Sequence, residues 1–243
     1  MMASTQTVLI TGATSGIGEA LFHQYVDRGS QVIGCGRNQE VLSAMAGKAY
    51  KTLSFDVNNH GDIEQAASEV EQLDILILNA GSCRYIDDAQ NFDGQLFEEV
   101  IATNLLSLGH MLQHFLPKVR KGGQVVFISS SATIVPFPRA EAYGASKAGV
   151  DYLANSLRLD LNAKGIDVTL VHPGFIKTPL TDKNDFPMPF MLSSEQAAQR
   201  IYKGVSAKKS YLHFPFRLTF LLKLFAWLPA PIWRSMMLKD IKS

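Results

Sequence analysis

The chain has 243 residues, a hydrophobic content of 47% and a formal net charge of +1 at neutral pH. This length supports one sizeable core and favours a single α/β domain over two. Because the charge is nearly balanced, there is no bulk electrostatic reason to expect a nucleic-acid partner.

Short apolar runs alternate with longer amphipathic stretches along most of the chain. Seven runs have the composition of buried strands, at residues 8–11, 31–34, 51–55, 74–79, 124–129, 167–172 and 210–214. Four stretches have apolar residues at three- and four-residue spacing and predict helices, at residues 16–28, 63–72, 95–119 and 143–163. This alternation is typical of βαβ units and of a parallel sheet covered on both faces. No linker or repeat interrupts it, so we predict one domain over residues 1–243.

The first predicted strand leads into a glycine-rich turn and then a helix, with the sequence Thr11-Gly12-Ala13-Thr14-Ser15-Gly16-Ile17-Gly18. Such a turn lets the backbone approach a pyrophosphate, whose charge is met by N–H groups and by the positive helix end. Gly12 would form the turn, Gly16 would admit the phosphate, and Gly18 would let the helix pack closely on the strand. Because the spacing is G-x3-G-x-G, a glycine-rich surface turn is the alternative.

The second predicted strand ends in Gly36-Arg37, where a dinucleotide site that prefers NAD has an acidic residue for the ribose 2′-hydroxyl. No acid stands at this position. The Arg37 guanidinium can instead hold a 2′-phosphate through charge-assisted hydrogen bonds, so NADP(H) is the predicted cofactor and NAD(H) the second candidate. The alternative is an ordinary solvated arginine in a turn.

Tyr143 and Lys147 stand one helical turn apart, so their side chains lie on one helix face. A phenol is a poor base at neutral pH, and a neighbouring ammonium lowers its pKa by favouring the ionised form. Ser130 follows a predicted strand and places a hydroxyl at the carboxyl edge of the sheet, where open α/β folds bind ligands. The alternative is a surface pair without a catalytic role.

The glycine-rich turn, Ser130 and the Tyr143-x3-Lys147 pair, in their order along the chain, resemble the motifs of the short-chain dehydrogenase/reductase family. Asn79-Ala80-Gly81, Asn104 and Pro173-Gly174 complete the set, and the resemblance covers residues 7–178. It implies a Rossmann-like, doubly wound α/β domain with a mostly parallel seven-stranded sheet in the order 3-2-1-4-5-6-7, flanked by helices. It also implies an NAD(P)-dependent oxidoreductase acting on an alcohol or a carbonyl, and a homodimer or homotetramer.

The resemblance implies roles residue by residue. Tyr143 resembles the acid/base that exchanges a proton with the substrate oxygen, and Ser130, thirteen positions earlier, resembles the residue that orients that oxygen. Lys147 resembles the group that lowers the tyrosine pKa and binds the nicotinamide ribose, and Asn104 resembles a member of the proton relay. Contacts to the cofactor are implied for Gly12, Thr14, Ser15, Gly16, Ile17, Gly18, Arg37, Asp56, Val57, Asn79, Ala80, Gly81, Tyr143, Lys147, Pro173, Gly174, Ile176 and Thr178.

Residues 215–243 form an apolar, basic extension. The chain has no acidic residue from Gln196 to Lys239, a stretch that includes most of this extension. This pattern is typical of a segment that lies on an anionic membrane surface, although its charges and prolines exclude a membrane span. The alternative, which the sequence favours, is a helix that covers the substrate cleft or packs on a partner subunit. Residues 175–193 have an irregular sequence and are predicted to form a substrate loop. An apolar extension near the cleft favours a lipophilic substrate.

Other features suggest no additional site. His110 and His114 lie four residues apart, but no third ligand lies nearby in the sequence, so no metal is predicted. Cys35 and Cys83 form no CxxC pair, and the polar start of the chain has no signal-peptide pattern, so we expect a cytoplasmic protein.

The sequence therefore predicts an NADP-preferring oxidoreductase that transfers a hydride between the cofactor and a lipophilic carbonyl or alcohol, with Tyr143 as acid/base. One alternative is a dinucleotide-binding sensor or scaffold that keeps the fold without turnover. Another is an NAD-preferring dehydrogenase that binds peripherally to a membrane.

Overall fold

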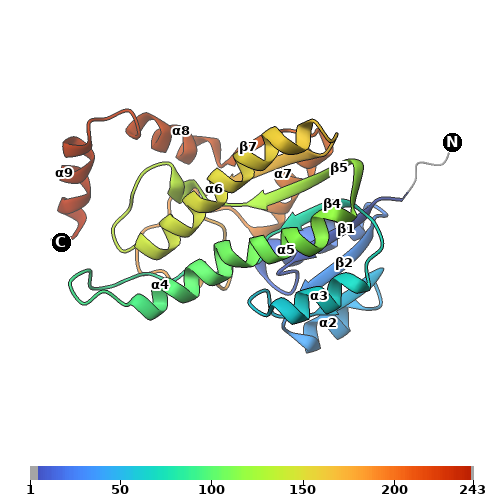
Figure 1. The fold of residues 1–243 in the computed structure, drawn as a ribbon. Helices are drawn as coiled ribbons and strands as arrows, with labels where there is room; N and C mark the ends of the chain where they lie inside the picture. The colour runs from blue at the N-terminus through green and yellow to red at the C-terminus, as the bar shows by residue number, and fades with distance from the viewer. Residues whose placement is uncertain (1–4, 242–243) are drawn as a thin grey trace.

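One seven-stranded sheet forms the centre of the protein (Figure 1). The computed structural model describes residues 5–241, so residues 1–4 and 242–243 of the predicted domain lie outside the described residues. The strands are β1 (Thr7–Thr11), β2 (Gln31–Gly36), β3 (Lys51–Ser54), β4 (Leu73–Leu78), β5 (Val119–Ile128), β6 (Asp167–Pro173) and β7 (Tyr211–Phe214). Their spatial order is β3-β2-β1-β4-β5-β6-β7 and every neighbouring pair is parallel, which confirms the predicted Rossmann-like α/β domain.

Helices cover both faces of this sheet. One face carries α1 (Gly16–Val26), α2 (Gln39–Met45) and α7 (Ser194–Ser206). The other face carries α3 (His60–Ser68), α5 (Ser107–Phe115) and α6 (Glu141–Asn162). Successive strand residues alternate between the two apolar clusters, as Leu76 and Ile77 do on β4. Burial on both faces explains why the strands are apolar throughout.

The turn between β1 and α1 depends on glycine at close contacts. Gly12 and Gly16 have φ angles of +64° and +56°, in the left-handed region that glycine enters without strain. A Cβ atom on Gly18 would lie 2.0 Å from the carbonyl oxygen of Gly12. The first turn of α1 can therefore approach the end of β1 only while residue 18 is glycine.

The prediction of one uninterrupted helix over residues 95–119 is wrong. α4 (Gly94–Ile101) passes into a π-helical segment (Ala102–Leu106) before α5 begins, and β5 already starts at Val119. The π-helical segment contains Asn104, whose side chain is buried and polar. An extra residue in a helical turn reorients the side chains around it, and such segments are frequent at functional sites.

The apolar extension forms two helices, α8 (Phe216–Phe225) and α9 (Ala230–Ile241). Leu218 and Leu222 of α8 and Trp233 of α9 are buried in a cluster with Val135. The indole Nε1 of Trp233 donates a hydrogen bond of 2.8 Å to the carbonyl oxygen of Pro136. Within residues 5–241, no helix has the length and apolar character needed to cross a membrane.

Candidate active site

A cavity lies at the carboxyl ends of the central strands, the edge at which open α/β sheets bind ligands. The glycine-rich turn, the ends of β4, β5 and β6, and the start of α6 contribute to its lining. Most of the predicted site residues line it, namely Gly12, Ser15, Gly16, Ile17, Asn79, Ala80, Gly81, Ser130, Tyr143, Lys147, Pro173, Gly174, Ile176 and Thr178. The fold thus brings together motifs that are far apart in the chain.

The start of α6 holds the two predicted proton-transfer groups. Burial raises the pKa of Tyr143, and a hydrogen bond with Ser130 acts in the opposite direction. The Lys147 Nζ donates a hydrogen bond of 2.9 Å to the carbonyl oxygen of Ile128, the last residue of β5. Burial lowers the pKa of Lys147 to about 8. The phenol is therefore protonated at neutral pH and faces a hydroxyl that can orient a substrate oxygen.

Asn104 does not line the cavity but fixes the segments that do. Its Oδ1 accepts a hydrogen bond of 2.7 Å from the backbone N–H of Ser82, and its Nδ2 donates to the Ser82 carbonyl oxygen at 2.8 Å. The same Nδ2 donates to Ser146 Oγ at 2.9 Å, and Ser146 Oγ donates to the carbonyl oxygen of Tyr143 at 2.7 Å. The π-helical segment therefore joins the residues after β4 to the first turn of α6.

Arg37 lies outside the cavity lining, at the end of β2. Its Nη1 is 3.3 Å from Asp56 Oδ2, and its side chain is 75% exposed. Exposed ion pairs of this kind contribute little, roughly 0–1 kcal/mol. The guanidinium therefore remains accessible to an anionic group. The other predicted contacts that do not line the cavity are Thr14, Gly18, Asp56 and Val57.

Sequence reasoning missed several residues that line the cavity, namely Ser82, Cys83, Ile128, Ser129, Pro179, Leu180 and Thr181. Ser82 and Cys83 directly follow the Asn-Ala-Gly motif, so extending that segment would have found them. Residues 179–181 belong to the predicted substrate loop, whose irregular sequence gives no sign of which side chains face inward. Ser146 stands between two recognised residues, and only the fold shows its bond to Asn104.

The predicted substrate loop, residues 175–193, folds back beside the cavity. Ile176 and Leu192 form a bridge at its base. The rings of Tyr85 and Phe186 meet edge to face with their centroids 5.5 Å apart. Arg139 holds the loop through ion pairs with Asp185 at 2.8 Å and with Asp87, before α4, at 2.6 Å. Among the cavity-lining residues in the described part of the chain, Lys147 is the one charged side chain.

The fold places a third histidine, His60, beside His110 and His114, although it lies far from them in the sequence. The Nε2 atoms of His60 and His114 are 2.8 Å apart, and the ring centroids of His60 and His110 are 4.5 Å apart. The separation of α3 from α5 in the chain concealed this contact. Across residues 5–241, no three histidine, cysteine or acidic side chains are arranged to hold a metal ion.

The cavity fits the dinucleotide that the glycine-rich turn predicts. A Cβ atom on Gly12 would lie 3.0 Å from Ala80 Cα, and one on Gly16 would lie 3.0 Å from Thr178 Cγ2, so glycine lets the turn approach the segments after β4 and β6 closely. Ser15 precedes α1 and makes no capping hydrogen bond through its side chain. The N–H groups at the start of α1 are therefore available to an anion such as a pyrophosphate.

Comparison with known proteins gives concordant matches. Residues 6–187 match the family model described as short chain dehydrogenase. A serine 3-dehydrogenase from Agrobacterium fabrum is 33% identical over 208 residues, which cover 82% of this chain and 81% of that protein. An NADP-dependent 3-hydroxy acid dehydrogenase from Salmonella typhi is 33% identical over 209 residues, which cover 82% of each chain.

The fold has a close structural counterpart. A short chain dehydrogenase from Burkholderia cenocepacia, solved in complex with NADP, superimposes with a TM-score of 0.85. The match covers 98% of this chain and 99% of that chain at 21% sequence identity. At this identity the likeness bears on the fold alone.

The burial of Lys147 predicts an unusual titration. In the cofactor-free protein its pKa should lie at about 8 instead of 10.5, so the amine is charged below pH 8 and neutral above it. Between these values the unfolded chain binds more protons than the folded one, so this group makes stability rise with pH across that window. NMR of protein labelled with 13C at lysine Cε should show one resonance with a midpoint near pH 8.

Two variants assign that resonance. It should be absent from Lys147→Arg and present in Lys48→Arg, because Lys48 is exposed. If every lysine resonance titrates near pH 10.5, the burial argument is wrong.

Proposed function

Because this chain belongs to the short-chain dehydrogenase family, as an NAD(P)-dependent oxidoreductase of an alcohol or a carbonyl, we propose that its substrate is lipophilic and its preferred cofactor NADP. The observation that carries the proposal is that Ser130, Tyr143 and Lys147 line one largely uncharged cavity. The alternative of a sensor without turnover is set aside, since the chain is an enzyme.

We propose that the protein is located in the cytoplasm, where free thiols such as those of Cys35 and Cys83 persist. Cell fractionation tests this location.

The proposed chemistry assigns one task to each side chain. When bound, the nicotinamide supplies or accepts the hydride. In the reducing direction, Tyr143 donates its phenolic proton to the carbonyl oxygen of the substrate while the carbonyl carbon gains the hydride. Ser130 orients that oxygen by hydrogen bonding, and the Lys147 ammonium stabilises the phenolate that remains. Oxidation follows the same path in reverse.

The cofactor would be held by the turn and the strand ends. Gly12, Ser15, Gly16 and Ile17 would bind the pyrophosphate through backbone N–H groups and the positive end of α1. Asn79, Ala80 and Gly81 would lie beside the cofactor, and Lys147 would reach the nicotinamide ribose. The remaining predicted contacts are Thr14, Gly18, Arg37, Asp56, Val57, Tyr143, Pro173, Gly174, Ile176 and Thr178.

The surroundings of the cavity support a lipophilic substrate. Tyr85, Phe175 and Phe186 form an aromatic group beside it. The two named relatives are dehydrogenases of serine and of 3-hydroxy acids, substrates with a carboxylate. In this chain the nearby Arg139 forms ion pairs with Asp87 and Asp185, so it is not available to a substrate carboxylate. The cation that lines the cavity is Lys147. A neutral, apolar substrate suits this lining better than a carboxylate does.

Turnover measurements test this proposal. With NADPH, aromatic and medium-chain ketones or aldehydes should give kcat/KM values at least about tenfold above those of a short 3-keto acid, because their apolar groups are buried. Tyr143→Phe should lower kcat by at least about 100-fold, because the proton donor is lost. NADPH binding, followed by its fluorescence, should stay nearly unchanged.

Tyr152→Phe is the matched control, since Tyr152 is an exposed tyrosine of the same helix, and it should keep wild-type turnover. Substantial turnover by Tyr143→Phe would contradict the mechanism. A preference for the short keto acid would contradict the substrate class.

The choice of NADP depends on Arg37. Arg37→Asp replaces the cation with a carboxylate that repels a 2′-phosphate, so the ratio of kcat/KM for NADPH to that for NADH should fall by about 10- to 100-fold. Arg28→Asp makes the same charge reversal beyond the other end of α1 and should leave the ratio unchanged. If Arg37→Asp also leaves it unchanged, the assignment is wrong.

We further propose that α5 and α6 pair with a partner subunit to give a homodimer or homotetramer. Exposed apolar side chains on this side support it, since Tyr152 and Leu159 of α6 are 80% and 78% exposed. Light scattering should give a mass of two or four chains of 26.7 kDa. Tyr152→Glu with Leu159→Glu should lower a dimer to one chain and a tetramer to two. Tyr50→Glu, an exposed site elsewhere, should leave it unchanged. A monomeric wild type would refute the proposal.

A further inference from the structure

Helix α8 is apolar on two sides, and among the residues that the structure describes one side is buried and the other is exposed. Leu218 and Leu222 face inward and are buried with Val135 and Trp233. The opposite side continues into the turn before α9, and we call it the outer stripe: Phe216, Phe220, Leu224 and Trp227, exposed by 67%, 53%, 54% and 88%. The four-residue spacing places the first three on one helix face, and the rings of Phe216 and Phe220 stack at 5.6 Å.

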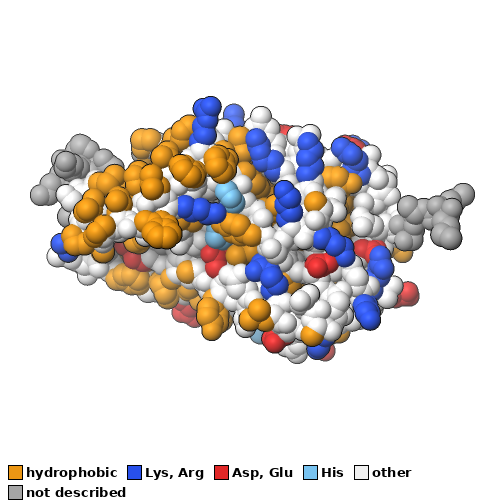
Figure 2. Space-filling model, turned by 90° about the horizontal axis from the view of Figure 1, so that it is seen from above, with side chains coloured by type: hydrophobic (Ala, Val, Ile, Leu, Met, Phe, Trp, Pro, Cys, Tyr) orange, Lys and Arg blue, Asp and Glu red, His pale blue; other side chains and the backbone are white. Residues whose placement is uncertain are grey.

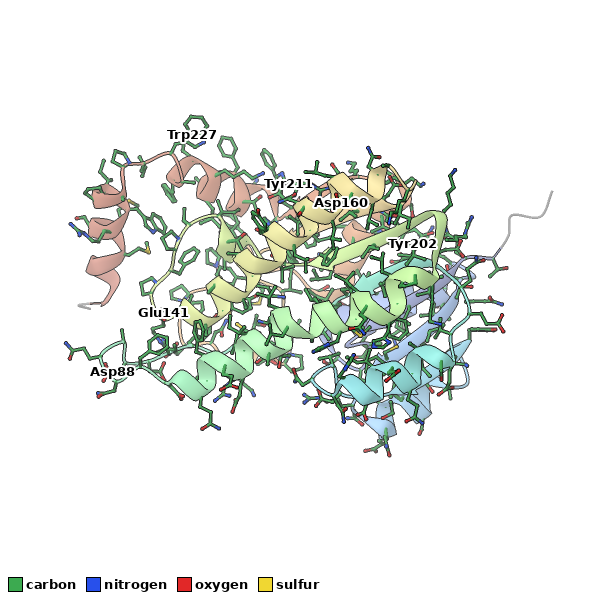
Figure 3. The ribbon with its side chains drawn as sticks, in the orientation of Figure 1. Asp88, Glu141, Asp160, Tyr202, Tyr211 and Trp227 are labelled. Atoms are coloured by element: carbon green, nitrogen blue, oxygen red, sulfur yellow. The ribbon has the colours of Figure 1, made fainter. Side chains whose placement is uncertain are left out.

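The outer stripe lies on a basic face. From Gln196 to Lys239 the chain has no acidic residue, so α7, β7 and α8 carry no carboxylate after Glu195. Figure 2 shows hydrophobic side chains gathered over one half of this face, with lysines and arginines beside them. Arg217 is exposed next to the stripe, and Lys223 Nζ lies 4.7 Å from the centroid of the Tyr211 ring. Figure 3 shows Trp227 at the turn between α8 and α9, pointing away from the protein.

The charges distinguish between the surfaces that could cover the stripe. A second copy related by a two-fold axis would pair the patch with itself and bring Arg217 and Lys223 toward their own counterparts. The stretch that carries both cations, Gln196 to Lys239, offers no carboxylate to separate those charges. A bilayer of anionic lipids supplies both the negative charge and an apolar layer for the aromatic rings, and tryptophan is favoured at such an interface.

We propose that the outer stripe docks the enzyme on an anionic membrane surface. The inner side of α8 packs beside the cavity, and the outer side remains for the bilayer. Leu218 lies directly against the cavity-lining Gly174, because a Cβ atom built on Gly174 would lie 2.6 Å from Leu218 Cδ2. If the substrate is lipophilic, as proposed above, docking would place the cavity next to the phase in which that substrate dissolves. The docking itself does not depend on that substrate class.

Vesicle flotation with the full chain tests the docking. The wild type should float with vesicles of phosphatidylcholine and phosphatidylserine, should not float with phosphatidylcholine alone, and should be released by salt. Phe220→Ser combined with Trp227→Ser should bind at least about tenfold more weakly, because two aromatic anchors are lost. Arg217→Glu should weaken binding by roughly fivefold or more for each unit of charge removed.

Tyr50→Ser is the matched control, since Tyr50 is 60% exposed outside this face, and it should float like the wild type. Turnover of a water-soluble carbonyl, which all these variants should keep, shows that they are folded. Failure of the wild type to bind the anionic vesicles would overturn the docking, and so would equal binding by Phe220→Ser/Trp227→Ser. If Trp227→Ser lowers the mass of the protein in solution below that of the wild type, the stripe binds a second copy of the chain, and the membrane docking is overturned. None of these results would alter the proposed catalytic function, which fails only if turnover is absent.

Discussion

The close approach of the β1–α1 turn to the end of β4 is the constraint on which the site depends. Thr11 Oγ1 accepts hydrogen bonds from the backbone N–H groups of Asn79 and Ala80, at 2.9 and 3.0 Å. Asn79 Nδ2 donates to the carbonyl oxygen of Thr11 at 3.0 Å. A side chain at Gly18 would clash with both Gly12 and Asn79. These contacts aim the start of α1 at the cavity while leaving no side chain across its floor.

A second set of bonds holds the other wall. Asp151 Oδ1, one turn beyond Lys147 on α6, accepts a hydrogen bond of 2.5 Å from Ser129 Oγ and lies 2.9 Å from His172 Nε2. His172 Nδ1 is 3.0 Å from the hydroxyl of Tyr211. β5, α6, β6 and β7 are thus joined by one partly buried polar network, which fixes α6 relative to the end of β5. His172 thus connects α6 to β7 through its two ring nitrogens.

The sequence predicted what depends on local composition and on motif order. The glycine turn and the Tyr143-x3-Lys147 pair belong to that class, since a shared helix face follows from spacing alone. The strand order came from the resemblance that the order of the motifs carries. Periodicity missed α2, which has only seven residues, and α7, whose buried side chains include Ala197 and Ala198. It also failed at residues 95–119, because a π-helical segment shifts the helical phase without changing the composition. Contacts between distant segments, such as Asn104 with Ser146, leave no local pattern at all.

Helix α8 shows most clearly why a pattern can be recognised while its meaning stays open. Its sequence is apolar on both sides, so composition alone cannot say which side is buried. The packing of the helix distinguishes the two sides. Thr219 is fully buried and its Oγ1 lies 2.7 Å from His213 Nδ1 of β7, so the side of α8 that carries Thr219 faces the protein. β7 pairs with β6, whose last residues border the cavity. The position of the exposed aromatic side relative to the active site is therefore set by the same strand order that builds the active site.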